Sequence, residues 1–200
     1  MKSKKIGVVD SGVSNISSVV FCLKRLNYLT KIAQKPESLD DSDVILLPGV
    51  GSFPSAMANL KKNNFDLYLK NAALNQRKII GICLGMQLLT SSSTEGGNHE
   101  GLGLIDGKVI RLHNSNHHVG WNKIKSSKKE IFLENSHNKY FYFNHTYKFV
   151  GSQKSQASHT FNQELIPAII MKKNIVGIQF HPEKSQKAGA ILLEDLIENL

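Results

Sequence analysis

Short, continuous apolar runs alternate with segments of helical periodicity through the first half of the chain. The runs at residues 5–9, 44–47 and 78–82 have the length and composition of buried strands. Between them, apolar residues recur at near-helical spacing at 16–26 and 56–69, as they do on the inner face of a helix. Strands separated by helices form βαβ units, so this half of the chain predicts a parallel sheet.

The second half follows another pattern. A polar, glycine-containing segment at residues 91–99 predicts a loop, and shorter strand-like runs separated by turns come after it. Residues 188–196 return to helical spacing and predict a closing helix. The chain as a whole therefore predicts an α/β fold with an antiparallel insertion. The strand-like runs of this half lie at residues 102–112, 140–143, 147–150, 168–171 and 175–180.

Length and cysteine content narrow the class of protein. The chain has 200 residues, of which 40% are hydrophobic and 20% charged, and this predicts one globular domain over residues 1–200. Its two cysteines, Cys22 and Cys83, lie far apart and outside any CxxC pair, which favours a reducing compartment over a disulfide framework. The first residues lack the apolar core of a signal peptide, and no stretch reaches the ~18 apolar residues of a membrane helix. We expect a cytoplasmic protein with no membrane contact.

The charge balance is basic, with a formal net charge of +9 at neutral pH. A basic surface can bind nucleic acid or an acidic partner. Here the lysines are scattered, and no run of five or more like charges occurs. We therefore expect no nucleic acid as a partner, and interpret the charge as a lysine-rich surface, with a basic side toward an acidic partner or a phosphorylated substrate as the alternative.

The strongest chemical signal is the segment GICLGMQ at residues 81–87. An apolar strand ends at Ile82 and a helical pattern begins after Cys83, which predicts a cysteine exposed on a sharp turn at the carboxyl end of the sheet. Flanking glycines Gly81 and Gly85 leave room for the tight backbone. A helix N-terminus stabilises a thiolate, and its N–H groups can hold an oxyanion. The alternative for a lone cysteine is a buried structural residue.

A second segment supplies the partners that a cysteine nucleophile needs. His181 and Glu183 follow a predicted strand and are two residues apart, so an extended backbone points both side chains to one side. His181 can serve as the base and Glu183 as the acceptor that orients it. Pro182 between them fixes one backbone angle. Seen alone, this pair could be a surface histidine and glutamate, but together with Cys83 it predicts a catalytic triad.

Other candidate sites are weaker. Gly49, Val50 and Gly51 follow a predicted strand and could offer backbone N–H groups to an oxyanion, although Pro-Gly after a strand is usually just a turn. The nearby histidines at positions 113, 117 and 118 lack a cysteine or paired carboxylates, so we interpret them as loop or interface residues. Neither GxGxxG nor GxxxxGK[ST] occurs. We expect no metal and no cofactor.

In combination, PGVG, GICLGMQ and FHPE, in this order, resemble the class I glutamine amidotransferases. The segments HHVGWN at 117–122, YFYFNHTY at 140–147 and GIQFHPEKS at 177–185 resemble, more narrowly, the glutaminase subunit of imidazole glycerol phosphate synthase. The resemblance runs from about residue 5 to the last residue. It implies a flavodoxin-like fold, with a mostly parallel central sheet, helices on both faces and a small antiparallel portion.

The resemblance also implies roles for individual residues. Cys83, His181 and Glu183 would form the triad that releases ammonia from glutamine, and Gly49 to Gly51 the oxyanion strand. Ammonia would pass to a TIM-barrel cyclase subunit for histidine biosynthesis. The residues implied around glutamine are Gln87, His145, Thr146 and Tyr147, and those on the partner face are Asn15, Trp121, Tyr142 and Lys184.

Two segments depart from the family pattern. Where the family has Tyr-Gly-x-Gly-Asn after the first strand, this chain has Ser11-Gly12-Val13-Ser14-Asn15, and Asn144 stands where an apolar residue is usual. Because the first segment faces the partner subunit in the family, an alternative partner is a sugar-modifying synthase of a bacterial surface-sugar pathway. Another hydrolase on the same triad is disfavoured by HVGWN and FNHTY, and a non-catalytic binding module by the intact triad.

Overall fold

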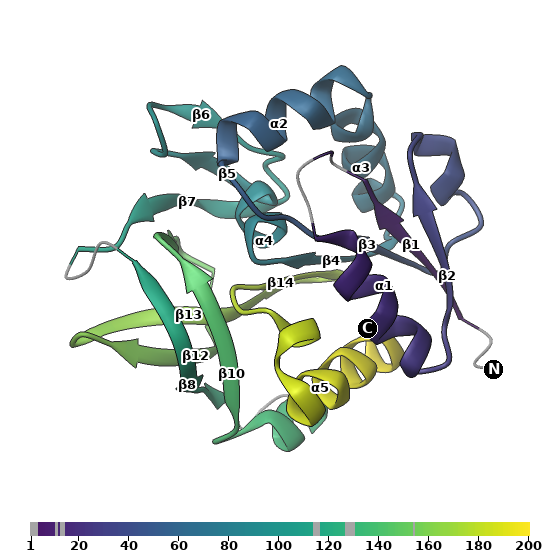
Figure 1. Ribbon diagram of the computed structural model, residues 1–200. Helices are drawn as coiled ribbons and strands as arrows, with labels where there is room; N and C mark the ends of the chain where they lie inside the picture. Colours follow the sequence, from purple (N-terminus) through teal and green to yellow (C-terminus); the bar gives the residue numbers. More distant parts are fainter. Residues whose placement is uncertain (1–3, 11, 13–14, 114–116, 127–130, 154) are drawn as a thin grey trace.

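The computed structural model describes residues 4–10, 12, 15–113, 117–126, 131–153 and 155–200. Within these residues a mixed sheet of eight strands forms the centre, in the order β2-β1-β3-β4-β14-β13-β12-β9 (Figure 1). From β2 to β14 in this order neighbouring strands are parallel, whereas β13, β12 and β9 continue the sheet with antiparallel pairing. Their bounds are β1 (Lys5–Val9), β2 (Leu29–Ala33), β3 (Val44–Leu47), β4 (Lys78–Ile82), β9 (Lys125–Ser126), β12 (Ser155–Phe161), β13 (Glu164–Lys172) and β14 (Ile175–Ile178).

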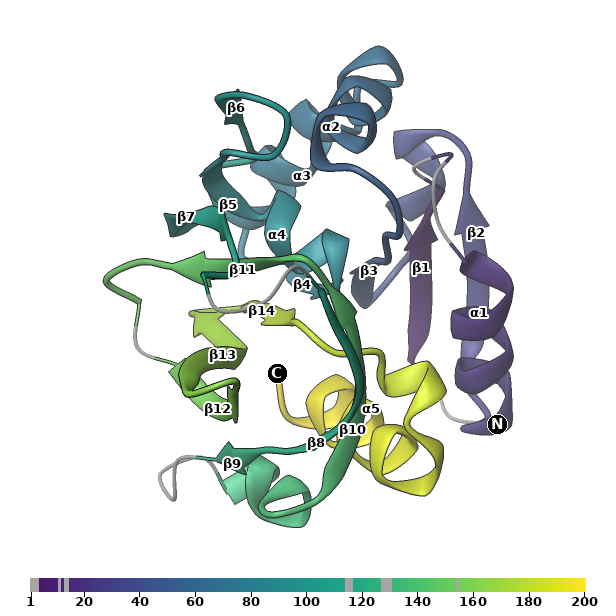
Figure 2. The same ribbon diagram turned by 60° about the vertical axis from the view of Figure 1, so that its left-hand side comes forward.

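Helices cover both faces of this sheet. Figure 2 shows α1 and α5 on one side and α2 and α3 on the other. Each face buries its own apolar cluster, with Leu23 and Leu192 in one and Phe53 and Leu69 in the other. The central strands are buried on both sides, which explains their continuous apolar runs, and the predicted α/β class and layer arrangement are confirmed. The helices are α1 (Ile16–Arg25), α2 (Phe53–Lys62), α3 (Phe65–Leu74), α4 (Leu84–Leu88) and α5 (Gln186–Asn199), with 3-10 turns at Pro36–Leu39, Ile131–Ser136 and Pro182–Lys184.

Two smaller sheets lie beside the main one. The first pairs β8 with β10, and the second has the order β11-β7-β5-β6. The predicted loop at 91–99 is wrong at its ends, because Ser92 pairs with Glu100 and Ser93 with His99 across β5 and β6. These strands carry few apolar residues, so alternation did not indicate them. Their bounds are β5 (Thr90–Ser93), β6 (His99–Glu100), β7 (Ile105–Arg111), β8 (His118–Lys123), β10 (Tyr140–His145) and β11 (Tyr147–Val150).

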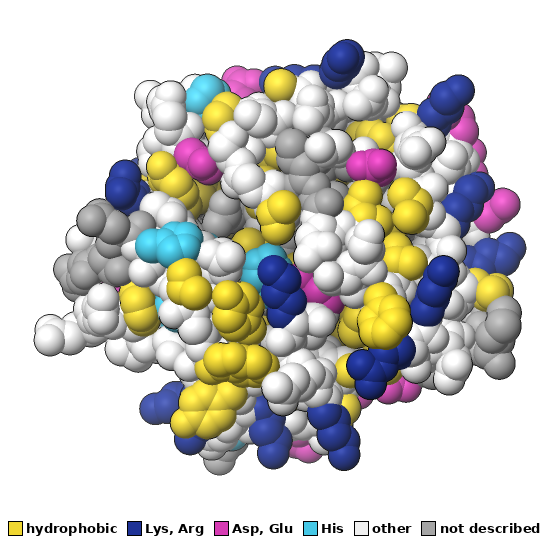
Figure 3. All heavy atoms as spheres, viewed as in Figure 1, with side chains coloured by type: hydrophobic (Ala, Val, Ile, Leu, Met, Phe, Trp, Pro, Cys, Tyr) yellow, Lys and Arg dark blue, Asp and Glu magenta, His cyan; other side chains and the backbone are white. Residues whose placement is uncertain are grey.

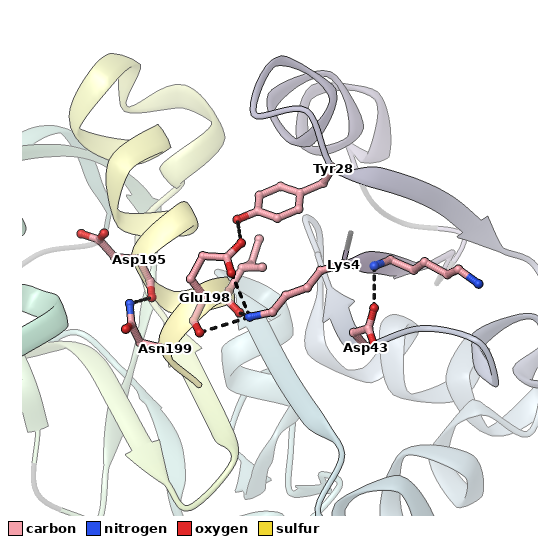
Figure 4. Close-up of polar contacts among 8 residues, drawn as sticks. Lys4, Tyr28, Asp43, Asp195, Glu198 and Asn199 are labelled. Carbon is pink, nitrogen blue, oxygen red and sulfur yellow. Dashed lines mark hydrogen bonds and ion pairs between the residues drawn. The ribbon is translucent and has the colours of Figure 1, made fainter. Parts of the chain in front are cut away.

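The last turn of α5 is tied to the first strands (Figure 4). Lys4 Nζ donates to the carbonyl of Ile197 at 2.7 Å and lies 3.1 Å from Glu198 Oε2. The hydroxyl of Tyr28 donates to Glu198 Oε1 at 2.6 Å. A cation at helix carbonyls is also favoured by the helix dipole. The contacts fix the helix that continues directly from the His181–Ser185 segment. Among the described residues, no helix combines the length and apolar character needed to cross a membrane.

Candidate active site

Cys83 sits at a strained turn between β4 and α4. Its backbone has φ +54° and ψ −110°, a left-handed φ that costs a non-glycine residue about 1–3 kcal/mol. The N–H of Cys83 donates to the carbonyl of Ile178 at 2.7 Å, which joins the turn to β14. A Cβ atom on Gly85 would lie 1.8 Å from the carbonyl oxygen of Leu47, so only glycine fits there. The close approach of α4 to β3 thus explains the second glycine of the motif.

His181 and Glu183 form a buried pair directly after β14. Nδ1 of His181 lies 2.8 Å from Glu183 Oε1, and the two side chains are 3% and 2% exposed. With Nδ1–H donating to the carboxylate, Nε2 is left to face Cys83, which lines the same cavity as His181. The backbone N–H of His181 donates to the carbonyl of Tyr142 at 2.9 Å, which ties the histidine to β10. The geometry therefore brings the three predicted residues together in the order thiol, imidazole, carboxylate.

The electrostatics favour a charged imidazole. Burial lowers the pKa of His181, but the negative charges of Cys83 and Glu183 and its hydrogen bonds to both outweigh burial and raise the pKa to about 10. His181 is then an imidazolium at neutral pH, and it is the counter-charge beside the Cys83 sulfur. Since α4 has only five residues, its dipole is small, and this imidazolium is a stronger source of positive potential than the helix N-terminus that the sequence suggested.

A cavity of about 190 Å³ opens in front of Cys83. Val50 and Gly51 of the predicted oxyanion segment line it. Gly49 lies beneath them, where a Cβ atom would come within 2.9 Å of Leu84 Cβ. The other predicted residues that line the cavity are Gln87, His145, Thr146, Tyr147 and His181. The sequence therefore located most of the wall that faces the sulfur.

Gln87 and His145 meet at one backbone carbonyl. The side-chain amide of Gln87 donates to the oxygen of Tyr147 at 3.1 Å, and Nδ1–H of His145 donates to the same oxygen at 2.8 Å. Gln87 also donates to Gln179 Oε1 at 3.3 Å. These bonds hold the corner between β10 and β11 against α4. Thr146 lies at this corner, so the hydrogen bonds of Gln87 and His145 also hold Thr146 in place beside the cavity.

Four lining residues, Leu84, Glu95, His117 and Asn144, were not predicted as part of the site. His117 bridges the corner, since its Nδ1 lies 2.8 Å from Thr146 Oγ1 and its Nε2 lies 2.9 Å from Asn144 Oδ1. The Cys83 thiol points to the carbonyl of Asn144 at 3.7 Å. The pairing of HHVGWN with FNHTY across β8 and β10 could have indicated His117, but nothing in the sequence signals Glu95.

Of the predicted partner-face residues, Trp121 and Tyr142 lie on the β8–β10 pair and Lys184 lies beside Tyr142. Trp121 is directly opposite Tyr142, with ring centroids 6.0 Å apart, and Trp121 is 44% exposed. Lys184 Nζ lies 5.9 Å from the centre of the Tyr142 ring. Asn15 is exposed at the start of α1. Figure 3 shows hydrophobic side chains gathered over β8 and β10, with lysine or arginine beside them. Ser11, Val13 and Ser14, which depart from the family pattern, lie outside the described residues.

The match to a family model decides the relationship. Residues 7–199 match the model of the class I glutamine amidotransferases. The chain belongs to this family. It is a glutamine amidotransferase, as the motifs predicted, and the predicted resemblance is confirmed.

Relatives with curated names refine this assignment. The chain is 41% identical to imidazole glycerol phosphate synthase subunit HisH of Prochlorococcus marinus, covering 95% of this chain and 92% of that protein. It is 38% identical to the HisH subunit of Bacillus subtilis, covering 94% and 93%. Among solved structures, PurLQS from Thermotoga maritima aligns with a TM-score of 0.79 at 16% identity, covering 98% and 99%. That structure supports the fold, and the curated relatives place the chain among HisH subunits.

Proposed function

We propose that this chain is the glutaminase subunit of imidazole glycerol phosphate synthase. It hydrolyses glutamine to glutamate and delivers ammonia to the synthase subunit for histidine biosynthesis. The observation that carries this proposal is the buried, hydrogen-bonded His181–Glu183 pair beside Cys83 at the wall of a cavity. The names of the relatives supply the pathway. The unpaired state of both cysteines agrees with action in the cytoplasm.

The chemistry follows from the order of the three side chains. The Cys83 thiolate attacks the side-chain amide carbon of glutamine, and the imidazolium of His181 protonates the leaving ammonia. The bond to nitrogen breaks as a glutamyl thioester forms. His181, now neutral, takes a proton from water, which attacks the thioester and releases glutamate and the thiol. Glu183 keeps the ring oriented and stabilises its positive charge throughout.

Two groups of residues would hold the substrate. Backbone N–H groups of the Gly49–Gly51 segment, together with that of Leu84 next to the nucleophile, would receive the developing oxyanion. Gln87, His145, Thr146 and Tyr147 would position the glutamine, because they line the same cavity as Val50, Gly51 and Cys83. These N–H groups must be positioned to bind the oxyanion of the transition state, and their arrangement in the resting chain need not do so.

The decisive experiment for the chemistry is Cys83→Ala in the complex with the synthase subunit. Glutamine-dependent synthesis should fall by several orders of magnitude, while synthesis from added ammonia should persist. Cys22→Ala is the matched control, since Cys22 lies on α1 and lines a different cavity. A glutamine-analogue electrophile should label Cys83 and spare Cys22. Wild-type glutaminase rates in Cys83→Ala would refute the assignment.

The proposed partner is a TIM-barrel synthase subunit that meets Asn15, Trp121, Tyr142 and Lys184. Free ammonia is mostly protonated at neutral pH, so direct transfer to the partner preserves its reactivity. We expect the lone chain to be a poor glutaminase, because a partner's ligand would bias the oxyanion segment toward its active arrangement.

Complementation of a histidine auxotroph that lacks this subunit, with the cognate barrel supplied, tests the pathway. Growth supports histidine biosynthesis. If only a surface-sugar synthase homologue stimulates glutamine hydrolysis, the chain belongs to that pathway and the proposed glutaminase reaction still holds. Full activity of the lone chain would refute activation by a partner.

A further inference from the structure

Three histidines from separate strands converge behind the wall of the glutamine cavity. His118 comes from β8, His145 from β10 and His159 from β12, and none is more than 4% exposed. One ring nitrogen of each lies within 4.8 Å of those of the other two. Because these histidines lie up to 41 residues apart, from His118 to His159, the sequence did not indicate the cluster. This cluster differs from the neighbouring histidines 113, 117 and 118 noted in the sequence. Of those, His117 lines the cavity, whereas His118 is buried in the interior.

The hydrogen bonds leave ring nitrogens directed at one another. His145 donates its Nδ1–H to the carbonyl of Tyr147 at 2.8 Å, so its Nε2 carries a free electron pair. Nδ1 of His118 lies 2.9 Å from this Nε2 and shares its proton with it. A histidine that donates one N–H to a carbonyl and presents its other nitrogen has the arrangement found in metal ligands.

His159 adds a nitrogen that the protein does not satisfy. Its Nε2 is buried and has no hydrogen-bond partner among the described residues. The other nitrogen, Nδ1, lies 3.3 Å from the side-chain amide nitrogen of Asn122. Buried polar atoms are nearly always paired, so an unpaired one indicates a missing partner.

The surroundings keep all three rings neutral. Burial lowers the pKa of His118 to about 4, and those of His145 and His159 to about 3. Phe161 stacks on His118 with ring centroids 4.0 Å apart, and Phe143 lies 4.2 Å from His159. The neutral imidazole is the form that binds a metal ion, so binding at neutral pH would need no deprotonation of the rings.

We propose that His118, His145 and His159 form a binding site for a transition-metal ion such as Zn²⁺, with water or hydroxide as the fourth ligand. Imidazole suits Zn²⁺, Cu²⁺ and Ni²⁺, and three histidines with one open position form a familiar tetrahedral set. Bonds of ~2.0–2.1 Å place tetrahedral ligand nitrogens about 3.3 Å apart. The rings must therefore close by roughly 1.5 Å from the widest separation.

The proton balance of this step is simple. The ion takes the place of the proton shared by His118 Nδ1 and His145 Nε2. That proton moves to Nε2 of His118. In His159, whose Nδ1 faces the amide nitrogen of Asn122, the proton moves from Nε2 to Nδ1 and the Asn122 amide turns its oxygen toward it, so that Nε2 can bind the ion. The three imidazoles thus stay neutral and lose no proton. The ion would join β12 of the main sheet to the β8–β10 pair, two parts of the fold that form separate sheets. The site is therefore a cross-link between sheets, and its His145 ligand also lines the cavity in front of Cys83.

Co²⁺ titration of the full-length Cys83→Ala variant tests the site, because this background removes the competing thiol next to His181. We expect one equivalent of Co²⁺ per chain with the visible absorption of a tetrahedral site, displaced by Zn²⁺, and a higher melting temperature with Zn²⁺. Adding His159→Phe, which keeps the ring packing, should abolish both signals. The matched control His113→Gln removes an exposed histidine and should leave both unchanged.

Several results would overturn the proposal. These are the absence of saturable binding in Cys83→Ala, equal binding after His159→Phe, or loss of binding after His113→Gln. Should His159→Phe fail to fold by circular dichroism, His159→Gln replaces it. Anomalous scattering from Co²⁺ in crystals of Cys83→Ala gives a second reading, and an ion located away from the three rings would refute the site.

Discussion

The carboxylate of Glu183 uses its two oxygens differently. Oε1 accepts the hydrogen bond of His181, whereas Oε2 is buried and has no hydrogen-bond partner among the described residues. Through this hydrogen bond and its negative charge, the carboxylate favours the charged imidazole.

Glu183→Gln should separate orientation from charge. The amide oxygen can still accept the His181 N–H, but the lost negative charge should lower the pKa of His181 from about 10. The imidazolium, which is stable below that pKa, should then be lost at lower pH. We expect the basic limb of the kcat/KM profile to move to lower pH, with the variant roughly 10–100-fold more active than His181→Ala. Steady-state kinetics across pH provide the measurement, and a Glu183 variant weaker than His181→Ala would reverse the two roles.

Single residues differ in how well the sequence indicated them. Cys83, His181 and Glu183 lie in short motifs whose spacing relates directly to a turn or an extended segment. Asn144 and His159 have no such local pattern, because their contacts cross between strands far apart in the chain. The sequence therefore indicated three residues that the structure brings together, and missed both a part of the cavity wall and the histidine cluster.

Among the elements, the β4–α4 turn depends on the closest backbone approach in the site. Gly85→Ala would place a methyl group against the carbonyl of Leu47, and the strand and helix must separate. We expect a loss of at least ~3 kcal/mol in the free energy of unfolding, at the upper end for overpacking. Gly103→Ala is the control, since the space there is open and only its positive φ of +68° opposes a side chain. Urea denaturation compares them, and equal losses would contradict the close-approach argument.

The β8–β10 pair carries two of the proposed partner residues, Trp121 and Tyr142, opposite each other. Trp121→Ala should weaken the complex with the synthase subunit by about 1–2 kcal/mol or more, as expected for an exposed aromatic at the centre of an interface. The fold should be unaffected, because Trp121 is half-exposed. Leu74→Ala is the control, an 81% exposed leucine on α3. Calorimetry of complex formation measures both, and an equal effect of the two variants would remove Trp121 from the interface.

Element prediction succeeded where strands are buried on both sides and failed where strands are exposed or polar. β3 and β4 have continuous apolar runs because helices cover both of their faces. β2 is an edge strand with mostly exposed or half-exposed residues, and β5, an inner strand of the four-stranded sheet, consists only of threonine and serine. Their pairing is set by neighbouring backbone, which leaves no apolar signature in the sequence.

For the whole molecule, the histidine cluster determines how stability responds to acid. The folded pKa values of about 3 to 4 lie below the unfolded value of 6.5, so the unfolded chain binds more protons between these limits. The stabilisation is fully present above pH 6.5 and is lost as pH falls toward 3. At pH 5 the free energy of unfolding is lower than above pH 6.5 by about 2 kcal/mol for each ring that stays neutral.

His159→Phe should reduce this acid sensitivity by about a third if the three rings contribute equally. His181 does not obscure the result, because its raised pKa contributes stability below pH 6.5 that is lost only as pH rises toward 10. Denaturation midpoints between pH 4.5 and 7, compared with those of His113→Gln, provide the measurement. Unchanged acid sensitivity in His159→Phe would show that the cluster does not stay neutral.

Strand β10 has a consequence for how such a protein can diverge. Its inward side chains, Phe141, Phe143 and His145, are buried, while Tyr140 and Asn144 face outward beside the half-buried Tyr142. Mutational drift at Tyr140 and Tyr142 can therefore change partner choice, while selection for glutamine hydrolysis acts on the inner row and on Asn144, which lines the cavity. We expect gene duplicates of this chain to accumulate differences at positions 140 and 142 of β10. A library randomised at 140 and 142 should thus yield altered docking specificity without loss of the hydrolase.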